Sequence, residues 1–297
     1  MAQITFFFVK NRPSMKDYSE ICRGFQKGLM THHILNSNLT GTFGIALSGG
    51  CARGFAHVGA LKALDECGIK PSVVAGVSAG SVIACMYAAG LSVDDMMRAF
   101  ADKSFNDLAE LSVPKDGFFR MNRFIRLMRK AIPYTNIEDL PIPTLICATD
   151  LNHCSLKVFD SGAIAERIAA SCSIPIVFSP MKIDGTYYVD GGVLHNLPSA
   201  VIRDHCDTLI GINVSPFVHE EKFKPSILEV AQRSYKMISR SNMDADKALC
   251  DIVVEMDSIA HHKVFSIKAM WEIADKGYNE TIKILKQNNL YRNNGKD

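Results

Sequence analysis

The chain has 297 residues, 47% of them hydrophobic, which is enough for one large α/β domain or two small ones and excludes a chain that is disordered throughout. Lys and Arg number 33 against 31 Asp and Glu, and the net charge of +2 gives no general reason to expect nucleic acid or an acidic partner. The nine cysteines are never spaced as C-x-x-C and lie mostly in apolar runs, so we expect reduced thiols and a cytoplasmic rather than a secreted protein.

Residues 1–40 are expected to form an N-terminal extension packed on the domain that follows. The apolar run at its start has no basic residues before it and is too short for a signal peptide or a membrane span. Apolar residues at helical spacing follow, from Tyr18 to Leu29. We interpret the segment as an edge strand plus a docked helix, and no transmembrane helix is predicted elsewhere.

Residues 41–290 are predicted to form a single domain in which strands alternate with helices. The expected strands are residues 43–48, 72–76, 144–149, 156–159, 208–214 and 251–255, with a hairpin around 184–185. The expected helices are residues 53–67, 79–89, 93–102, 118–131, 162–172, 226–249 and 266–286. This alternation predicts a three-layer α/β/α fold with a mainly parallel central sheet.

The pentapeptide from Gly76 to Gly80 (GVSAG) lies between a run typical of a strand and a run typical of a helix. Strand, sharp turn and helix in this order expose the central Ser78 at the positive end of the helix, where negative charge on a substrate oxygen is favoured. Gly76 and Gly80 remove side chains that would collide at the turn. Ser78 is therefore a candidate nucleophile, and an ordinary turn is the alternative interpretation.

A glycine-rich loop, Ser48 to Gly54 (SGGCARG), separates the first predicted strand from the first predicted helix. Its small residues allow backbone N–H groups to converge, as binding of an oxyanion or a phosphate requires. Cys51 stands where a dinucleotide-binding loop needs glycine, and the Lys-Ser/Thr of a Walker A loop is absent. Parallel first and second strands would place this loop beside Ser78, which favours an oxyanion hole over a loop that only serves helix packing.

A third motif, Val189 to Gly192 (VDGG), contains an Asp-Gly pair, which taken alone is more often a turn than a site. A serine nucleophile, however, needs a base within hydrogen-bond reach. A carboxylate can serve without histidine when its surroundings raise its proton affinity towards the working pH. Asp190 is thus a candidate for this role.

These three motifs, in this order, make the chain similar to the patatin-like phospholipase family. The glycine-rich loop continues into residues 55–59 (FAHVG), and the Asp-Gly motif continues into residues 193–198 (VLHNLP). Residues 169–178 also resemble the segment that the family carries before its Asp-Gly motif. The similarity runs from about residue 43 to 215 and continues more weakly to about residue 285.

The resemblance implies a patatin-like hydrolase domain that acts as a lipid acyl hydrolase of the phospholipase A or lysophospholipase type, without metal or organic cofactor. It implies a dyad in which Ser78 is the nucleophile, forming an acyl-serine intermediate, and Asp190 is the general base. It also implies that the backbone N–H groups of Gly49, Gly50 and Cys51 hold the oxyanion. Arg53 would supply a positive charge nearby. The other motif positions are Gly54, Gly76, Gly80, Gly191 and Gly192. The implied substrates are phospholipids, lysophospholipids or other acyl esters.

Two features test this assignment. The family usually has a third glycine where this chain has Cys51, so the backbone of Cys51 must avoid conformations open only to glycine. An unperturbed aspartate, with a pKa of about 3.9, is a weak base at neutral pH. The scheme therefore requires that Asp190 is buried or that the helix terminus activates Ser78.

Alternatives remain open for the base and for the activity. A Ser-acid-His triad could combine one of three aspartates with a later histidine: Asp150, Asp160 or Asp190 with His195, His205, His219, His261 or His262. We interpret His195 as a loop residue and His57 as a buried core histidine. A thioesterase or acyltransferase could use the same dyad, and a non-catalytic regulatory protein could keep the fold.

Residues 91–140 form a mostly helical region that we expect to face the substrate. In the helix predicted over 118–131, apolar residues recur at three- and four-residue spacing, and basic residues occupy much of the remainder: Arg120, Arg123, Arg126, Arg129 and Lys130. Such a helix fits an anionic bilayer or a cover over an acyl pocket, and an ordinary surface helix is the alternative. Contact with a bilayer would make the protein cytoplasmic with peripheral membrane association.

Overall fold

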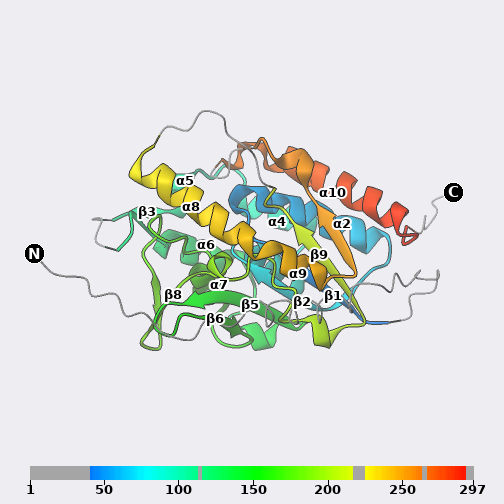
Figure 1. Ribbon diagram of the computed structural model, residues 1–297, viewed down its shortest axis with the longest axis horizontal. Coiled ribbons are helices and arrows are strands. Elements are labelled where there is room, and N and C mark those ends of the chain that lie inside the picture. The colour runs from blue at the N-terminus through cyan, green and yellow to red at the C-terminus, as the bar shows by residue number, and fades with distance from the viewer. Residues whose placement is uncertain (1–40, 113–115, 217–224, 263–265, 292–297) are drawn as a thin grey trace, which may run out of the picture. The chain divides into compact units, whose positions relative to one another are not determined.

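The computed structural model describes residues 41–291 except 113–115, 217–224 and 263–265. The extension expected over residues 1–40 lies outside the described residues. The main sheet has the strand order β10-β9-β1-β2-β5-β8-β7, and β6 also pairs with β5 (Figure 1). Its strands are β1 (Phe43–Leu47), β2 (Pro71–Val77), β5 (Thr144–Asp150), β6 (Ser155–Phe159), β7 (Met181–Ile183), β8 (Thr186–Asp190), β9 (Thr208–Asn213) and β10 (Ile252–Glu255).

The sheet is parallel through its centre and antiparallel towards one edge. β1 runs parallel to β2 and β9, β9 to β10, and β2 to β5. β5 pairs antiparallel with β6 and β8, and β7 pairs antiparallel with β8. The predicted hairpin joins β7 to β8 through Asp184 and Gly185, whose φ angles of 49° and 87° suit a two-residue turn. The prediction of a mainly parallel central sheet is confirmed.

Alternate residues of the central strands face two different cores. Ile45 and Leu47 of β1 belong to the larger core, whereas Ala46, between them, belongs to the smaller one. The larger core is covered by helices that include α2 (Phe55–Glu66), α3 (Ala79–Ala88), α4 (Val93–Phe100), α7 (Ile164–Ser171) and α10 (Met270–Gln287). The smaller core is completed by Leu197, Ile202 and Met243. The predicted three-layer arrangement is therefore confirmed. The face of the sheet with the smaller core buries fewer apolar residues than the other face.

Helices α2 and α10 lie side by side along their lengths (Figure 1). Gly59 of α2 and Gly277 of α10 lie at this contact, because a Cβ atom on either glycine would run into the backbone of the other helix. The C-terminal helix is thereby held against the helix that follows the glycine-rich loop. Close helix packing is thus a role for Gly59, which lies just beyond the loop motif.

Several predicted helices are shorter or divided. Residues 51–54 form a 3₁₀ turn before α2, and the helix expected over 226–249 is divided at Asn242 into α8 (Ile227–Ser241) and α9 (Met243–Ala248). The Asn242 side-chain amide donates a 2.7 Å hydrogen bond to the Leu194 carbonyl, which attaches this break to the segment after Asp190. Similarly, residues 267–269 form a 3₁₀ turn before α10.

The helix expected over residues 118–131 begins later, as α6 (Asn122–Ala131). Phe119 and Arg120 instead form strand β4, which pairs with β3 (Glu110–Leu111). The Phe119 N–H also donates a 2.9 Å hydrogen bond to the Val177 carbonyl. Backbone pairing with distant segments therefore overrides the local helical pattern at these residues.

Two further findings concern membranes and cysteines. Among the helices of the described part of the chain, none is both long and apolar enough to cross a membrane. The cysteines within the described residues are all free thiols, as the sequence predicts; Cys22 lies outside those residues.

Candidate active site

Ser78 occupies the sharp turn between β2 and α3, as the sequence predicts. Its φ of 51° and ψ of −124° are unusual for a residue with a side chain, and such backbone strain, of roughly 1–3 kcal/mol, is concentrated at functional sites. The two flanking glycines make the turn possible. A Cβ atom on Gly76 would lie 2.5 Å from the Ser81 Cα atom, and a Cβ on Gly80 would collide with the Leu47 carbonyl. Ser78 is only 5% exposed, so it faces internal space rather than bulk solvent.

A hydrogen-bonded residue from another element fixes this turn. The Ser78 N–H donates a 2.8 Å hydrogen bond to Ser171 Oγ, at the end of α7. The Ser171 hydroxyl in turn donates to the Cys147 carbonyl of β5 at 2.7 Å. Ser171 belongs to the segment 169–178 that resembles the family, but the sequence alone indicates no separate role for it. A buried serine whose partners are distant in the chain carries no local signal.

The strand register brings Asp190 to the level of Ser78. Val77 pairs with Cys147 across the parallel β2–β5 ladder, and Ala148, the next residue, pairs with Asp190 across the antiparallel β5–β8 ladder. Ser78 and Asp190 therefore flank β5 at one height, about 10 Å apart in the backbone, since neighbouring strands are about 4.8 Å apart. Their side chains approach each other over this strand.

The Asp190 carboxylate is fully buried. Burial raises its pKa from 3.8 to about 6, and the Gly192 N–H and the nearby Ser78 and Tyr235 side chains offset part of this effect. Asp190 Oδ1 accepts a 2.9 Å hydrogen bond from the Gly192 N–H, whereas Oδ2 has no well-formed hydrogen bond among the described residues. The backbone thus orients one carboxylate oxygen, and the other oxygen has no such partner among the described residues.

Tyr235 of α8 is the aromatic neighbour of this carboxylate, and sequence reasoning missed it. A Cβ atom on Gly192 would run into the Tyr235 hydroxyl. A Cβ on Gly191 would collide with the Cys147 carbonyl, and one on Gly54 would lie 2.6 Å from the Ala79 Cβ. These glycines therefore serve close approach between the segments that carry the site.

The glycine-rich loop lies directly beside Ser78. A Cβ atom on Gly49 would be 3.3 Å from the Ser78 Cβ. The Gly49 N–H, however, donates a 3.1 Å hydrogen bond to the Asn196 carbonyl, so it is not a free donor for an oxyanion. This corrects the expectation for Gly49, and Asn196, which the sequence analysis did not single out, holds the loop. Cys51 has a φ of 52°, so its backbone lies in the left-handed region that glycine adopts most readily.

The Arg53 guanidinium is bound by backbone carbonyls of segments distant in the chain. It donates to the backbone carbonyls of His262, Pro216 and Ala260 at 3.1, 3.2 and 2.5 Å. Burial lowers its pKa below the ordinary value. Its main contact is therefore with the segments around Pro216 and Ala260, which it ties to the loop next to the nucleophile.

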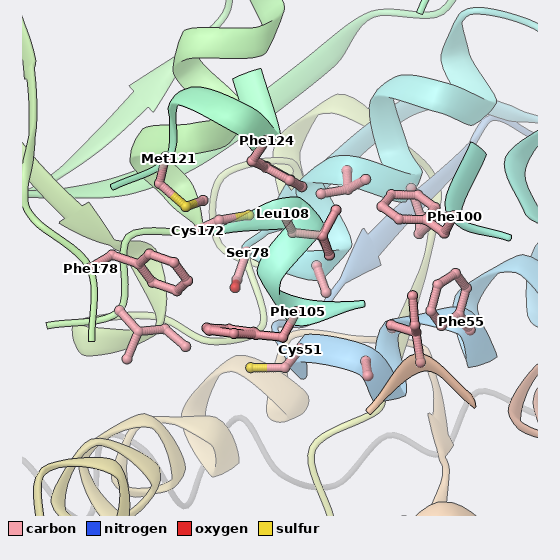
Figure 2. A pocket seen from close by; sticks show the side chains of 17 residues that line it. Cys51, Phe55, Ser78, Phe100, Phe105, Leu108, Met121, Phe124, Cys172 and Phe178 are labelled. Carbon is pink, nitrogen blue, oxygen red and sulfur yellow. The ribbon is translucent and has the colours of Figure 1, made fainter. Parts of the chain in front are cut away.

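An apolar cavity of about 150 Å³ begins at Ser78. Figure 2 shows the Ser78 hydroxyl among aromatic and aliphatic side chains that converge on it. The region 91–140 supplies several of them: Phe100, Phe105, Leu108, Met121 and Phe124. An apolar cavity of this size excludes water and accepts apolar groups, so it can hold part of a hydrocarbon chain.

A second cavity of about 560 Å³ also reaches Ser78. The two cavities share three lining residues: Cys51, Ser78 and Ile174. Much of the wall of the second cavity comes from α8 and is polar, with Gln232, Tyr235, Lys236 and Ser239 facing it. The candidate nucleophile thus stands where an apolar and a polar compartment meet, as the ester group of an amphiphile would.

The histidines do not form a triad with Ser78 in the hydrogen bonds of the described residues. His195 Nδ1 lies 3.1 Å from Asp246 Oδ1, and His153 Nδ1 lies 2.9 Å from Asp150 Oδ2. His57 is buried, with Nε2 on the Ser48 carbonyl at 2.9 Å, and burial lowers its pKa to about 4, so it is neutral. The remaining candidates differ in position: His205 lies in an exposed 3₁₀ turn, His261 and His262 line the polar cavity, and His219 lies outside the described residues.

The family model described as patatin-like phospholipase matches residues 45–201, more than half of the chain. The chain therefore belongs to the patatin-like phospholipase family, and the resemblance carried by its three motifs is confirmed.

Curated relatives agree with this membership over part of their length. An uncharacterized NTE family protein of Mycobacterium tuberculosis is 33% identical over 175 residues, which are 58% of this chain and 48% of the relative. The human patatin-like phospholipase domain-containing protein 6 is 32% identical over 186 residues, which are 59% of this chain and 14% of that protein. The chain thus matches about half of the mycobacterial relative and a much smaller part of the human one.

Among solved structures, VipD from Legionella pneumophila aligns with a TM-score of 0.57 at 16% identity. The alignment covers 85% of this chain and 68% of VipD. At this identity the similarity concerns the fold alone, and it agrees with the α/β architecture described above.

Proposed function

We propose that this protein is a lipid acyl hydrolase that cleaves carboxylic esters through a Ser78–Asp190 dyad. The observation that carries the proposal is the position of Ser78, which stands on a strained turn at the junction of an apolar and a polar cavity. A buried carboxylate with a raised pKa lies beside it. The family and the lysophospholipase named among its relatives, from Cryptococcus neoformans, support a lipid substrate.

In the first step, Asp190 accepts the hydroxyl proton while Ser78 Oγ attacks the ester carbonyl carbon. The tetrahedral oxyanion accepts hydrogen bonds from the glycine-rich loop. When the bond to the leaving oxygen breaks, Asp190 returns the proton to that oxygen and an acyl-serine forms. Water, deprotonated by Asp190, then attacks the acyl-serine and releases the fatty acid and the serine hydroxyl.

The proposed oxyanion donors are the N–H groups of Gly50 and Cys51. Gly49 is left out because its N–H is bound to the Asn196 carbonyl. The positive φ of Cys51 turns the loop at this point while the residue keeps its N–H, so a side chain replaces the usual glycine without removing a donor. Arg53 supports this loop by holding the carbonyls around it.

The pKa of Asp190 suits a base at neutral pH. A carboxylate with a pKa of about 6 is mostly ionised at pH 7 and is a stronger base than a free aspartate. Burial thus supplies the raised proton affinity that the sequence-based scheme requires. No histidine is needed for the proposed reaction.

The test measures hydrolysis of p-nitrophenyl esters and lysophospholipids together with labelling by a fluorophosphonate probe. Ser78→Ala should abolish labelling and reduce hydrolysis by at least about a thousandfold, and Asp190→Asn should reduce hydrolysis strongly. Ser72→Ala, at an exposed serine on the same strand, and Asp160→Asn, at an exposed aspartate, are the matched controls. Near-normal hydrolysis by folded Ser78→Ala, or labelling mapped to another serine, would exclude the dyad.

We further propose that α6 contacts an anionic bilayer. Its apolar residues Phe124 and Met128 are buried in the protein, and the Arg123 side chain donates to the Asn106 carbonyl, so any lipid contact uses the outward basic face. Replacing Arg126 of α6 and Arg120 of the adjoining strand β4 by Glu should weaken binding to phosphatidylglycerol vesicles but not to phosphatidylcholine vesicles. Lys283→Glu on α10 is the control, and unchanged vesicle binding by the double variant would refute the contact.

A further inference from the structure

The polar cavity beside Ser78 has no assigned ligand. It meets the apolar cavity at Ser78, so an ester bound with its acyl chain in the apolar cavity extends its other part, the leaving group, into the polar one. At about 560 Å³, it has the size of a small-molecule site. Its chemistry therefore bears on which leaving groups the protein accepts.

Helix α8 presents a row of cations to this cavity. Arg233, Lys236 and Arg240 lie three and four residues apart, which places them on one face of the helix, and all three line the cavity. Glu229 is the acidic residue of α8 in the same wall, two turns before Lys236. The side chains that line the cavity thus carry more positive than negative charge, with Arg53 adding to them from the glycine-rich loop.

Lys236 lines this cavity together with Cys51 and Ser78. Its positive charge lowers the pKa of the Cys51 thiol against the larger effect of burial. One turn further along α8, Ser239 lines the same cavity and is 5% exposed. Its hydroxyl has no well-formed hydrogen bond among the described residues, although it lies near Tyr235. Buried hydroxyls without such a partner are rare and indicate a ligand or water.

We infer that the cavity face of α8 binds a phosphate group carried by the leaving group of the substrate, with Lys236 as its principal cation and Ser239 as a hydroxyl donor. A phosphate presents several acceptor oxygens and negative charge, which match a row of cations and a hydroxyl. This inference rests on the proposed ester hydrolysis and specifies its substrate: esters with an anionic, phosphate-bearing leaving group are preferred over neutral ones. The phosphate could belong to a glycerophosphate head group or to the coenzyme A of a thioester.

The experiment compares three substrates with the same oleoyl chain: lysophosphatidic acid, monoacylglycerol and oleoyl-CoA. For the wild-type protein we expect kcat/KM to be at least about tenfold higher for a phosphate-bearing substrate than for monoacylglycerol. In Lys236→Gln this ratio should fall at least about tenfold, mainly through KM. Lys283→Gln, an exposed lysine on α10, should keep the ratio within about twofold.

The readouts separate failure of this inference from failure of the proposed hydrolysis. If Lys236→Gln lowers kcat/KM for lysophosphatidic acid relative to monoacylglycerol, the phosphate belongs to a lipid head group. If the variant lowers this ratio for oleoyl-CoA alone, the phosphate belongs to a thioester. The phosphate subsite is excluded if the wild-type protein has equal kcat/KM for monoacylglycerol and both phosphate-bearing substrates. It is also excluded if Lys236→Gln lowers kcat/KM equally for all three. Neither result contradicts the proposed hydrolysis. Absence of any hydrolysis that depends on Ser78 overturns the proposed function itself.

A second measurement does not depend on turnover of a lipid. Glycerol 3-phosphate should inhibit hydrolysis of p-nitrophenyl butyrate competitively in the wild-type protein, and glycerol should not. Lys236→Gln and Ser239→Ala should each raise the inhibition constant of glycerol 3-phosphate by about tenfold. No inhibition of the wild-type protein at millimolar glycerol 3-phosphate would contradict a head-group site.

Discussion

The Ser78 N–H donates its hydrogen bond to the hydroxyl of Ser171, and this 2.8 Å contact joins the strained turn at Ser78 to the end of α7. Because the same hydroxyl donates to the Cys147 carbonyl, Ser171 links three elements: the turn after β2, helix α7 and strand β5. One buried side chain therefore determines how the strained turn is held.

Ser171→Ala is expected to lower kcat while leaving KM nearly unchanged. The substitution leaves the buried Ser78 N–H without its acceptor, which costs about 1–3 kcal/mol in the free energy of unfolding. It also lets the Ser78 hydroxyl move, so we expect kcat for p-nitrophenyl butyrate to fall about tenfold or more. Urea unfolding and steady-state kinetics measure the two effects.

Ser173→Ala is the matched control, since Ser173 is also buried and its hydroxyl donates to the Ala169 carbonyl at 2.8 Å. It should lose stability without a comparable loss in kcat. Equal kcat values for the two variants would mean that the Ser171 hydroxyl does not position the nucleophile.

The raised pKa of Asp190 predicts the pH dependence of hydrolysis. The base must be ionised to accept a proton, so kcat/KM should fall as the pH decreases through about 6, the pKa of Asp190 in the folded protein. A pH–rate profile with a neutral substrate such as p-nitrophenyl butyrate measures this limb. Full activity maintained down to about pH 4 would exclude Asp190 as the base with this pKa.

The same burial predicts that Asp190→Asn stabilises the fold. Because the pKa of Asp190 is raised from 3.8 to about 6, the unfolded chain releases this proton first, and ionisation destabilises the folded state as the pH rises between these values. Above about pH 6 the penalty is on the order of 3 kcal/mol. The Asp190→Asn variant should therefore be more stable than the wild-type protein at pH 7, with the difference in stability vanishing near pH 4.

Chemical denaturation across this pH range measures the stability of both proteins. Asp160→Asn, at an exposed position, should show no such gain. A constant difference between wild type and Asp190→Asn at all pH values would contradict the raised pKa.

Cys51 tests the conformation of the oxyanion loop. Cys51 has a φ of 52°, and replacing it by glycine would relieve backbone strain of about 1 kcal/mol in the folded state. Glycine also makes the unfolded chain more flexible, which costs a similar amount of stability. Cys51→Gly should therefore fold and remain active. Cys51→Val should lower both Tm and kcat/KM, because β-branched residues are poorly tolerated at positive φ. Cys154, with a φ of 51° at an exposed turn, is the control: Cys154→Val should lower Tm alone.

Leu108 tests the apolar cavity as the acyl site. Leu108→Trp adds a larger side chain to the wall of a cavity of about 150 Å³, so hydrolysis of p-nitrophenyl octanoate should fall about tenfold relative to the acetate. Leu111→Trp, at a residue 77% exposed, should keep the wild-type chain-length profile. An unchanged profile for Leu108→Trp would place the acyl chain elsewhere.

The sequence predicts the strand–turn–helix around Ser78 well because its signals are local. Gly76, Gly80 and the apolar runs beside them all favour one geometry. The hairpin around residues 184–185 is also predicted, but the antiparallel pairing of β8 with β5, which brings Asp190 level with Ser78, depends on contacts between distant segments. A single sequence gives no direct signal for such a register.

The hydrogen-bond partners of the predicted site could not be assigned in the same way. The sequence does not distinguish the loop N–H groups from one another, yet the Gly49 N–H is bound by the Asn196 carbonyl. The Arg53 guanidinium is directed to three backbone carbonyls. Tyr235 and Lys236 come from a helix that follows the last motif, where side chains facing a cavity have the same helical spacing as side chains facing solvent. These contacts are tertiary and require the structure.

The pairing of β1 with β9 has a consequence for how the protein acquires activity. Residues 43–47 pair with residues 208–212, and the proposed nucleophile, base and oxyanion loop follow strands β2, β8 and β1. Contacts between such distant segments form slowly because the entropy of closing long loops opposes them. A folding intermediate with most of its helices but without the β1–β9 pairing would lack a working site. Esterase activity would then appear on refolding later than helical structure, and a truncated chain that ends before β9 would not gain it.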